Sequence, residues 1–542
     1  MLLLLPPEIA VRILCFLELP DLMRMHQVHS HLREYIQSFH ILQYRIATQS
    51  AYVEDNPTST LPISERLKLM RKLERGIYDL TGGIYLSSDD DGHTLHYVQL
   101  PSKKDDLIEW KSIDAQKPVV DIGLSVLEHD LLAAITSYVH EVQLLQLSTG
   151  KVHPRAQVPV LFLADSRQES PTVVAIEIVG VNLVLIITHN ISVPASAQRN
   201  HIYMFDWTSG ELKLKFDARR NTYSGIVLLT PELVLLPNMR EFAFEIWAIP
   251  SGPCLASTLP LSAAESERKH LPNPLVSLGL PILFTSYYNS ELSCRAEPNP
   301  TVSPSSFACA TGPCTEAMMP PAKKPFRAAP DEALIICNIL VSAFHNDATE
   351  TWTMFSRRSD MLAAVMQAME TSGRGPDHDS ANGGGTRDTS TGIAAEKVAY
   401  ERWGPDITRW LRTARHPASW ITTSAGTRCV HALRIPRGPA RLRVLDFNPF
   451  AVRRACGADV QVVRDEGTMV SFPFSHPFSG KLGYTLVPFV PEGAWEEEQD
   501  AWDFDALLMD EERLVGLKTD PDTDLLKEII VMHIGEEASV QT

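Results

Sequence analysis

Cysteine is scarce in this sequence, with eight residues in a chain of 542. They are scattered from Cys15 to Cys456 without the close spacing of a disulfide framework. This distribution is typical of reduced thiols and excludes a small scaffold held together by disulfides. We therefore expect a protein of the cytoplasm or the nucleus.

Long apolar runs are also absent. The longest candidates, residues 181–187 and 333–344, fall short of the roughly 20 residues that cross a bilayer. Residues 1–5 are apolar, but Pro6 and Pro7 end the run and no positive segment comes before it. The pattern is therefore not that of a secretory signal. It predicts a soluble protein with no membrane partner.

Basic residues are fewer than acidic residues as well. The chain has 49 Lys and Arg residues against 66 Asp and Glu residues, which leaves a formal net charge of -17 at pH 7. Such a charge opposes extended contact with the phosphates of nucleic acid. No nucleic-acid partner is predicted.

Sequence motifs of catalysis and cofactor binding are missing. No Walker loop, Gly-x-Ser-x-Gly elbow or His-Glu-x-x-His pair occurs. Cys294, Cys309 and Cys314 are too widely spaced to indicate a zinc site. The sequence therefore predicts no enzyme, no metal and no cofactor.

What the sequence does contain begins with three short helical patterns. Prolines at residues 6–7 suit a first helical turn, and an apolar face recurs over residues 9–17. A second helix is expected over residues 20–28, and Ser30 suits the cap of a third over residues 32–39. Three such helices bury little surface, so we expect them to pack on a further structure.

These residues resemble the F-box, the helical module through which substrate receptors bind a Skp-type adaptor and, through it, a cullin. The resemblance covers residues 5 to about 46 and rests on the phrases at 5–9, 13–17, 19–22 and 28–33. Leu32 stands where many F-boxes carry tryptophan, a departure that bears on binding strength. The resemblance implies a core and adaptor-facing surface formed by Leu5, Pro6, Ile9, Ile13, Leu17, Leu22, Val28 and Leu32. A helical cap on the following domain is the alternative.

A linking segment, residues 49–76, follows the F-box module of residues 1–48. Within it Leu67, Met70 and Leu73 share one face of an expected helix, and basic residues cover the other face. The basic face is interpreted as a solvated surface.

Several phrases further along resemble a large group of basidiomycete F-box proteins. They lie at residues 42–46, 205–210, 402–406, 444–449 and 509–513. This resemblance extends over most of the chain but implies little about mechanism.

The remaining residues, 77–542, predict a large, mainly β domain. Short runs rich in Val, Ile, Leu and aromatic residues recur, and helical periodicity is scarce. The main strands are expected at residues 95–99, 131–136, 141–147, 172–179, 183–188, 201–206, 225–229, 233–236, 242–247, 333–341, 351–355, 427–433, 442–447, 506–509, 514–517 and 528–534.

A repeated turn indicates the architecture of this domain. Small polar residues and a glycine follow an apolar strand at Gly150, Gly210 and Gly252, which are 60 and 42 residues apart. That period matches a four-stranded propeller blade, and a pair of β-sandwiches is the alternative. The predicted fold class is α+β multidomain, a three-helix F-box followed by a β-propeller.

Three finer expectations concern the ends and insertions of the domain. Residues 528–534 are expected to close the ring against an early strand. Residues 295–330 are rich in Pro, Ala and Ser, and residues 371–392 contain almost no apolar side chains. Both segments are expected to be mobile insertions.

One basic region stands out in this acidic chain. Arg434, Arg437, Arg441 and Arg443 form a candidate face for an acidic or phosphorylated client, because guanidinium pairs bidentately with phosphate. Solvated arginines on strand exteriors explain them equally well. The F-box resemblance implies a substrate-recognition adaptor of a cullin-type ubiquitin ligase with an unknown client. An F-box scaffold that acts outside ubiquitylation is the alternative.

Overall fold

The computed structural model describes the chain in two compact units. The first comprises Met1–Tyr78 with Thr519–Glu528, and the second comprises Asp79–Lys518 with Ile529–Thr542. The described residues are 7–17, 25, 30–43, 78–89, 92–101, 109–136, 141–163, 172–189, 199–252, 273–300, 328–344, 349–371, 397–413, 423–433, 441–455, 460–464, 466–469, 473–489, 506–519 and 526–533. The expected linking helix at 49–76 lies outside them.

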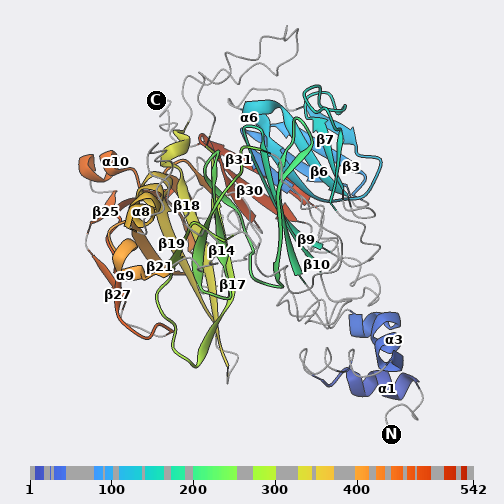
Figure 1. Ribbon diagram of the computed structural model, residues 1–542, viewed down its shortest axis with the longest axis horizontal. Helices are drawn as coiled ribbons and strands as arrows, with labels where there is room; N and C mark the ends of the chain where they lie inside the picture. The colour runs from blue at the N-terminus through green and yellow to red at the C-terminus, as the bar shows by residue number, and fades with distance from the viewer. Residues whose placement is uncertain are drawn as a thin grey trace, which may run out of the picture. The chain divides into compact units, whose positions relative to one another are not determined.

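The first unit contains two packed helices, α1 (Pro7–Leu14) and α3 (Ser30–Ser38), visible at the N-terminal end of the chain in Figure 1. The third helix begins at Ser30, which was expected to cap it but is its first residue, and the helix ends at Ser38. Of the expected second helix only Met25 is described, and it is helical. The two helices and the segment after α3 enclose one small apolar core.

The second unit is built from consecutive antiparallel sheets. Among the described residues, seven sheets have three or more strands and follow one another in chain order. The first holds β1 (Tyr78–Thr81), β2 (Ile84–Ser88), β3 (Thr94–Gln99) and β4 (Trp110–Asp114). The second holds β5 (Val119–Ser125), β6 (Leu131–Thr136), β7 (Glu141–Gln146) and β8 (Val160–Phe162), with helix α6 (Val126–His129) between its first two strands.

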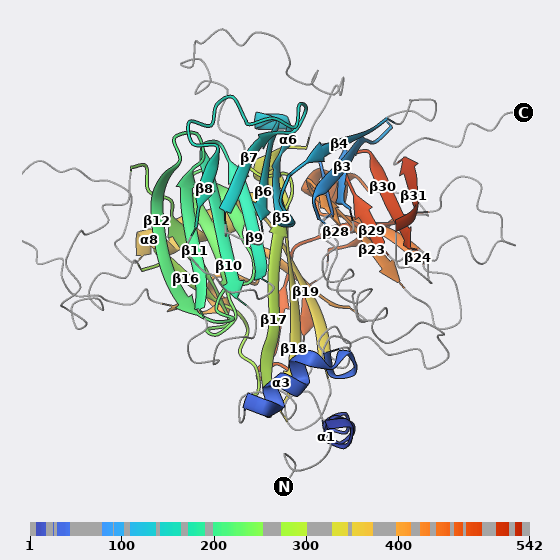
Figure 2. The same ribbon diagram turned by 90° about the vertical axis from the view of Figure 1, so that its right-hand side faces the viewer.

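The third and fourth sheets repeat this up-and-down order. The third holds β9 (Thr172–Val179), β10 (Asn182–His189), β11 (Arg199–Asp206) and β12 (Glu211–Arg219), which run side by side in Figure 2. The fourth holds β13 (Val227–Thr230), β14 (Leu233–Asn238), β15 (Ala243–Ala248) and β16 (Val276–Gly279), and β20 (Lys397–Val398) adds a parallel fifth strand.

The last three sheets complete the body, and the fifth and sixth of them include helices. The fifth holds β17 (Tyr287–Ala296), β18 (Leu334–Ala343), β19 (Thr349–Arg357) and β21 (Thr408–Thr413), with η3 (Pro330–Glu332), α8 (Arg358–Thr371) and α9 (Tyr400–Trp403) between them. The sixth holds β22 (Ser424–Ala425), β23 (Arg428–Leu433), β24 (Arg441–Asp446), β28 (Tyr484–Phe489) and β25 (Gln461–Val463), with α10 (Pro449–Arg454). The seventh holds β29 (Ala506–Met509), β30 (Arg513–Thr519) and β31 (Leu526–His533). A separate pair joins β26 (Gly467–Met469) to β27 (Phe478–Gly480).

In several sheets the first strand lies toward the first strand of the next sheet. Strand β5 contacts β9, β9 contacts β13, and β13 contacts β17. Strand β29 contacts β22 and β23 of the sheet before it. First strands that meet across sheet boundaries form the inner side of a radial array, which is the arrangement of a β-propeller. The body is therefore mainly β and propeller-like, as the repeated turn predicts.

The three repeated glycines occupy equivalent places in this array. Gly150 and Gly210 have φ angles of 67° and 79° in the turns that follow β7 and β11, the third strands of their sheets. Gly252 likewise follows the third strand of the fourth sheet, β15, but there the connection is not a tight hairpin because β16 begins only at Val276.

Two expectations need adjustment in light of the strands. Strand β31, which covers most of residues 528–534, pairs with β30 in its own sheet and not with an early strand. Of the first expected insertion, residues 295–296 belong to β17, and residues 297–300 and 328–330 are described. Residues 301–327 and 372–392 lie outside the described part of the chain.

Candidate functional site

Helix α1 has apolar side chains on two opposite faces. One face carries Leu14, which is fully buried against α3. The other side carries Ile9 and Ile13 of α1 and, in the turn that follows the helix, Phe16; their side chains are 45%, 39% and 78% exposed. We call these three residues the outward face of α1. Apolar side chains that gather on an exposed surface commonly mark a contact with a partner. The outward face of α1 is therefore a surface suited to a protein partner.

Leu32 belongs to the interior of this module. It is buried with Val11 and Leu14 from α1 and with Ile36 and Leu42 around it. The leucine that stands in place of tryptophan thus packs inside the first unit and is not part of the outward face.

The other residues of the expected adaptor site divide into two groups. Ile9 and Ile13 lie on the outward face, whereas Leu17 is half-buried against the core. Leu5, Pro6, Leu22 and Val28 lie outside the described residues. Phe16 and Ile41 are exposed apolar residues that the expected site omitted. Phe16 follows Ile9 by seven positions, so its helical spacing could have identified it.

The candidate client-binding arginines are only partly described. Arg434 and Arg437 lie outside the described residues, and for Arg441 only the backbone, within β24, is described. Arg443 is half-buried on β24, where it pairs with Pro488 of β28. The structure therefore does not bring the four arginines together as one described surface.

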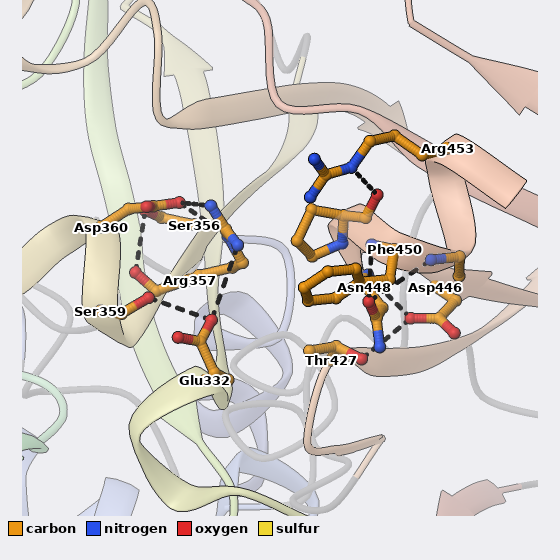
Figure 3. Close-up of polar contacts among 12 residues, drawn as sticks. Glu332, Ser356, Arg357, Ser359, Asp360, Thr427, Asp446, Asn448, Phe450 and Arg453 are labelled. Atoms are coloured by element: carbon orange, nitrogen blue, oxygen red, sulfur yellow. Dashed lines mark hydrogen bonds and ion pairs between the residues drawn. The ribbon is translucent and has the colours of Figure 1, made fainter.

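The segment after β24 is a capped turn. The carboxylate of Asp446 accepts hydrogen bonds from the hydroxyl of Thr427 and from the backbone N–H of Asn448, both at 2.9 Å. The side chain of Asn448 in turn accepts from the backbone N–H of Phe450, at the first turn of α10. Arg453 lies over the exposed ring of Phe450 at 4.9 Å. Figure 3 shows this network beside a second one.

The second network joins β19, α8 and η3. The guanidinium of Arg357 donates from Nε and Nη2 to Oδ2 of Asp360, both at 2.7 Å, and Nη1 lies 3.6 Å from Glu332 (Figure 3). Ser359 also donates to Glu332 at 3.1 Å. These groups satisfy one another, so we interpret both networks as structural supports at the ends of neighbouring sheets.

Other phrases of the basidiomycete resemblance have similar structural roles. In the phrase at 205–210, Oδ1 of Asp206 accepts from the backbone N–H groups of Thr208 and Ser209. The indole of Trp207 is buried and donates to the carbonyl of Gly180 at 2.8 Å. In the phrase at 509–513, buried Arg513 donates to Oδ2 of Asp510, also at 2.8 Å.

A separate exposed apolar group lies where β17 begins and β18 ends. The rings of Tyr288 and Phe344 are 4.8 Å apart, and Ile282 and Phe284 are exposed nearby. The backbone N–H of Phe344 donates to the carbonyl of Ser286 at 2.9 Å, which ties the two segments together. We define Ile282, Phe284, Tyr288 and Phe344 as the apolar tip of the fifth sheet.

None of the groups of His, Cys, Asp and Glu side chains in the described part of the chain is arranged to hold a metal ion. No helix among the described residues is both long and apolar enough to span a bilayer.

Comparison with known protein families identifies a domain within the first unit. Residues 2–44 match the F-box domain. The chain therefore carries an F-box domain followed by a propeller-like body. No curated protein matches the chain.

Two solved structures show distant likeness to the chain. The first is the Dos1 propeller, with 7% identity and a TM-score of 0.25, where the match covers 49% of this chain and 56% of the Dos1 chain. The chain thus spans little more than half the length of that structure. The second is the C-terminal WD40 domain of Sif2, with 7% identity and a TM-score of 0.30, covering 76% of this chain and 93% of that domain. At these TM-scores neither likeness bears on function.

Proposed function

We propose that this protein is the substrate-recognition subunit of a cullin-type ubiquitin ligase, located in the cytoplasm or the nucleus. The exposed apolar face of α1, formed by Ile9, Ile13 and Phe16, carries this proposal. It lies within the F-box match, and F-box domains in general bind Skp-type adaptors. The body would hold a client beside the ubiquitin-transferring machinery and would perform no chemistry itself.

Docking of the adaptor would bury the outward face of α1. Complete burial of a side chain such as Ile13 or Phe16 stabilises a complex by about 1.5–3 kcal/mol relative to exposure. Leu32 supports this surface indirectly, because it fixes α3 against α1. A smaller side chain than tryptophan at this position therefore changes the interior of the module and leaves the exposed face available.

A scaffold that assembles proteins without ubiquitylation is the second candidate. Both functions use the adaptor, so adaptor binding alone does not separate them. The discriminating experiment is affinity purification of the full chain from its own cells, with mass spectrometry of adaptor, cullin and co-purified clients. The proposal predicts that the cullin is recovered, and that client abundance rises when the protein is removed. Recovery of the adaptor with unchanged client abundance would favour the scaffold.

Client binding is proposed for the body, where two described features are available. Arg443 offers a cation, and the apolar tip of the fifth sheet offers exposed aromatic rings, a composition typical of interaction surfaces. The variants Arg443→Glu and Phe344→Asp each remove one of these two possible client contacts. Loss of client with Arg443→Glu alone indicates an acidic or phosphorylated degron, and loss with Phe344→Asp alone indicates an apolar one. Unchanged client recovery with both variants would exclude these two features as client contacts.

A further inference from the structure

Two buried cysteines face each other across the first two strands of the fifth sheet. Cys294 on β17 is directly opposite Cys337 on β18 in the antiparallel ladder. Both lie in the apolar core that joins the fourth and fifth sheets, and they are 2% and 0% exposed. Both are free thiols. Among the four cysteines that the structure describes, these are the two that lie opposite each other on paired strands.

The position of the two cysteines in the ladder is suited to a disulfide. Directly opposite residues of an antiparallel pair point to the same face of the sheet, and their Cα atoms are about 4.5 or about 5.5 Å apart. Disulfides join residues whose Cα atoms are about 4.4–6.8 Å apart. A hydrogen bond already joins the two thiols. A bond between the sulfur atoms of Cys294 and Cys337 therefore needs no rearrangement of either strand.

The pair lies close to the end of its ladder. Cys294 is two residues before Ala296, where β17 ends, and within its sheet β17 pairs with β18 alone. Buried Arg358 holds this end closed, because its guanidinium donates to the carbonyls of Ala296 at 3.2 Å and Pro298 at 2.7 Å. Local opening of the last few pairs exposes both thiols while β18, β19 and β21 stay paired.

Burial keeps the closed pair unreactive. Burial, the hydrogen bond with Cys337 and the charge of that neighbour all raise the pKa of the Cys294 thiol above its usual range. The thiolate is the form of cysteine that attacks an oxidant. The pair therefore stays reduced in the closed ladder and reacts during local opening.

We propose that Cys294 and Cys337 form a redox modification site, at which a peroxide converts the two thiols into a disulfide between β17 and β18. The thiolate of one cysteine attacks the O–O bond of hydrogen peroxide, which gives a sulfenic acid and, with one proton, a water molecule. The second thiol attacks the sulfenic sulfur, a second water leaves, and the S–S bond forms. The two thiols lose two electrons and two protons, and one peroxide becomes two waters. Because the second thiol is already in place, the disulfide forms before further oxidation.

The disulfide would join the chain covalently between residues 294 and 337 and fix the register of β17 on β18. The apolar tip of the fifth sheet lies where these two strands begin and end, so oxidation would also hold the two segments of the tip together. The site lies within the second unit. Its formation is independent of the proposed adaptor and client.

The test is disulfide mapping of the folded full chain. The reduced protein is treated with hydrogen peroxide in native buffer, remaining thiols are blocked with iodoacetamide in denaturant, and the protein is digested without reductant for mass spectrometry. We expect the peptides of Cys294 and Cys337 to be recovered linked to each other, and a reductant to separate them. Cys429, a buried free thiol on β23, is the internal control and should be recovered blocked by iodoacetamide.

A variant shows whether the second thiol directs the reaction. In Cys337→Ser the linked peptide should be lost, and Cys294 should be recovered as a sulfenic or sulfinic acid. Peroxide should raise the melting temperature of the wild type and not that of Cys337→Ser, because a disulfide restricts the unfolded chain. The proposal is overturned if both wild-type cysteines are recovered blocked by iodoacetamide after peroxide treatment, or linked to other cysteines. The wild-type digest decides this even if Cys337→Ser fails to fold.

Discussion

Gly83 of the first sheet and Arg513 of the last sheet lie against each other. A Cβ atom at Gly83 would stand 3.1 Å from Nη1 of Arg513, and Gly83 has a φ angle of +80° in the turn between β1 and β2. Arg513 is fully buried beside Asp510. The two ends of the propeller-like body therefore meet through a turn and a buried ion pair, and not through a shared strand.

A side chain at Gly83 should weaken this joint. Gly83→Val places a β-branched residue at a left-handed φ and crowds both Gln99, whose Nε2 would be 2.9 Å from the new Cβ, and Arg513. We expect a loss of unfolding free energy of about 1–3 kcal/mol. Gly252→Val is the matched control, because nothing lies within 4 Å of a Cβ there. Thermal melting of both variants is the measurement. Equal melting temperatures would show that the first and last sheets do not depend on this contact.

Gly404 should tolerate no side chain, for a different reason. A Cβ atom there would lie 2.1 Å from Cε2 of Tyr400, whose hydroxyl accepts a 3.0 Å hydrogen bond from the indole of Trp410. Gly404→Ala must therefore displace a buried ring, at a cost of about 1–3 kcal/mol. We expect a lower melting temperature or insoluble protein, whereas Gly252→Ala should melt as the wild type. An unchanged melting curve for Gly404→Ala would contradict this packing.

His129 should make the body less stable in acid. Burial, reinforced by the charge of Arg155, lowers the pKa of His129 to about 4, while the unfolded side chain takes up a proton near pH 6.5. The stability that it contributes is present above about pH 6.5 and is lost as the pH falls toward 4. His129→Gln should remove up to about 3 kcal/mol of this pH dependence.

Urea denaturation at pH 7 and pH 5 measures the difference between this variant and the wild type. Burial raises the pKa of Asp121 and of Glu177, which acts in the opposite direction, so only the difference between variant and wild type isolates the histidine. If His129→Gln loses as much stability between the two pH values as the wild type does, His129 is not the group that titrates.

Much of the body could be predicted from the sequence because each strand carries its own pattern. Runs such as Thr172–Val179 are β-branched and continuous, and the structure has a strand with the same bounds. Helix α8 was not foreseen. Its buried side chains Met361, Val365 and Met369 alternate with alanines and other apolar residues, so little contrast marks one face.

The approach of carboxyl groups from several sheets could not be predicted from local pattern. Asp79, Asp121, Glu177 and Glu297 are isolated along the sequence, and each alone resembles an ordinary polar residue of a strand or loop. They approach one another only because the first strands of several sheets share the inner side of the array. The outward face of α1, in contrast, can be predicted from the sequence, because Ile9, Ile13 and Phe16 recur at helical spacing within eight positions.

The central claim, that the outward face of α1 binds a Skp-type adaptor, is tested most directly by titration calorimetry of the purified full chain with that adaptor. We predict that the wild type binds and that Ile13→Asp and Phe16→Asp each weaken binding at least about tenfold, or about 1.4 kcal/mol. Phe162→Asp, at an exposed aromatic residue of the body, should bind as the wild type. Absence of binding by the wild type, or equal affinities for all four proteins, would contradict the account.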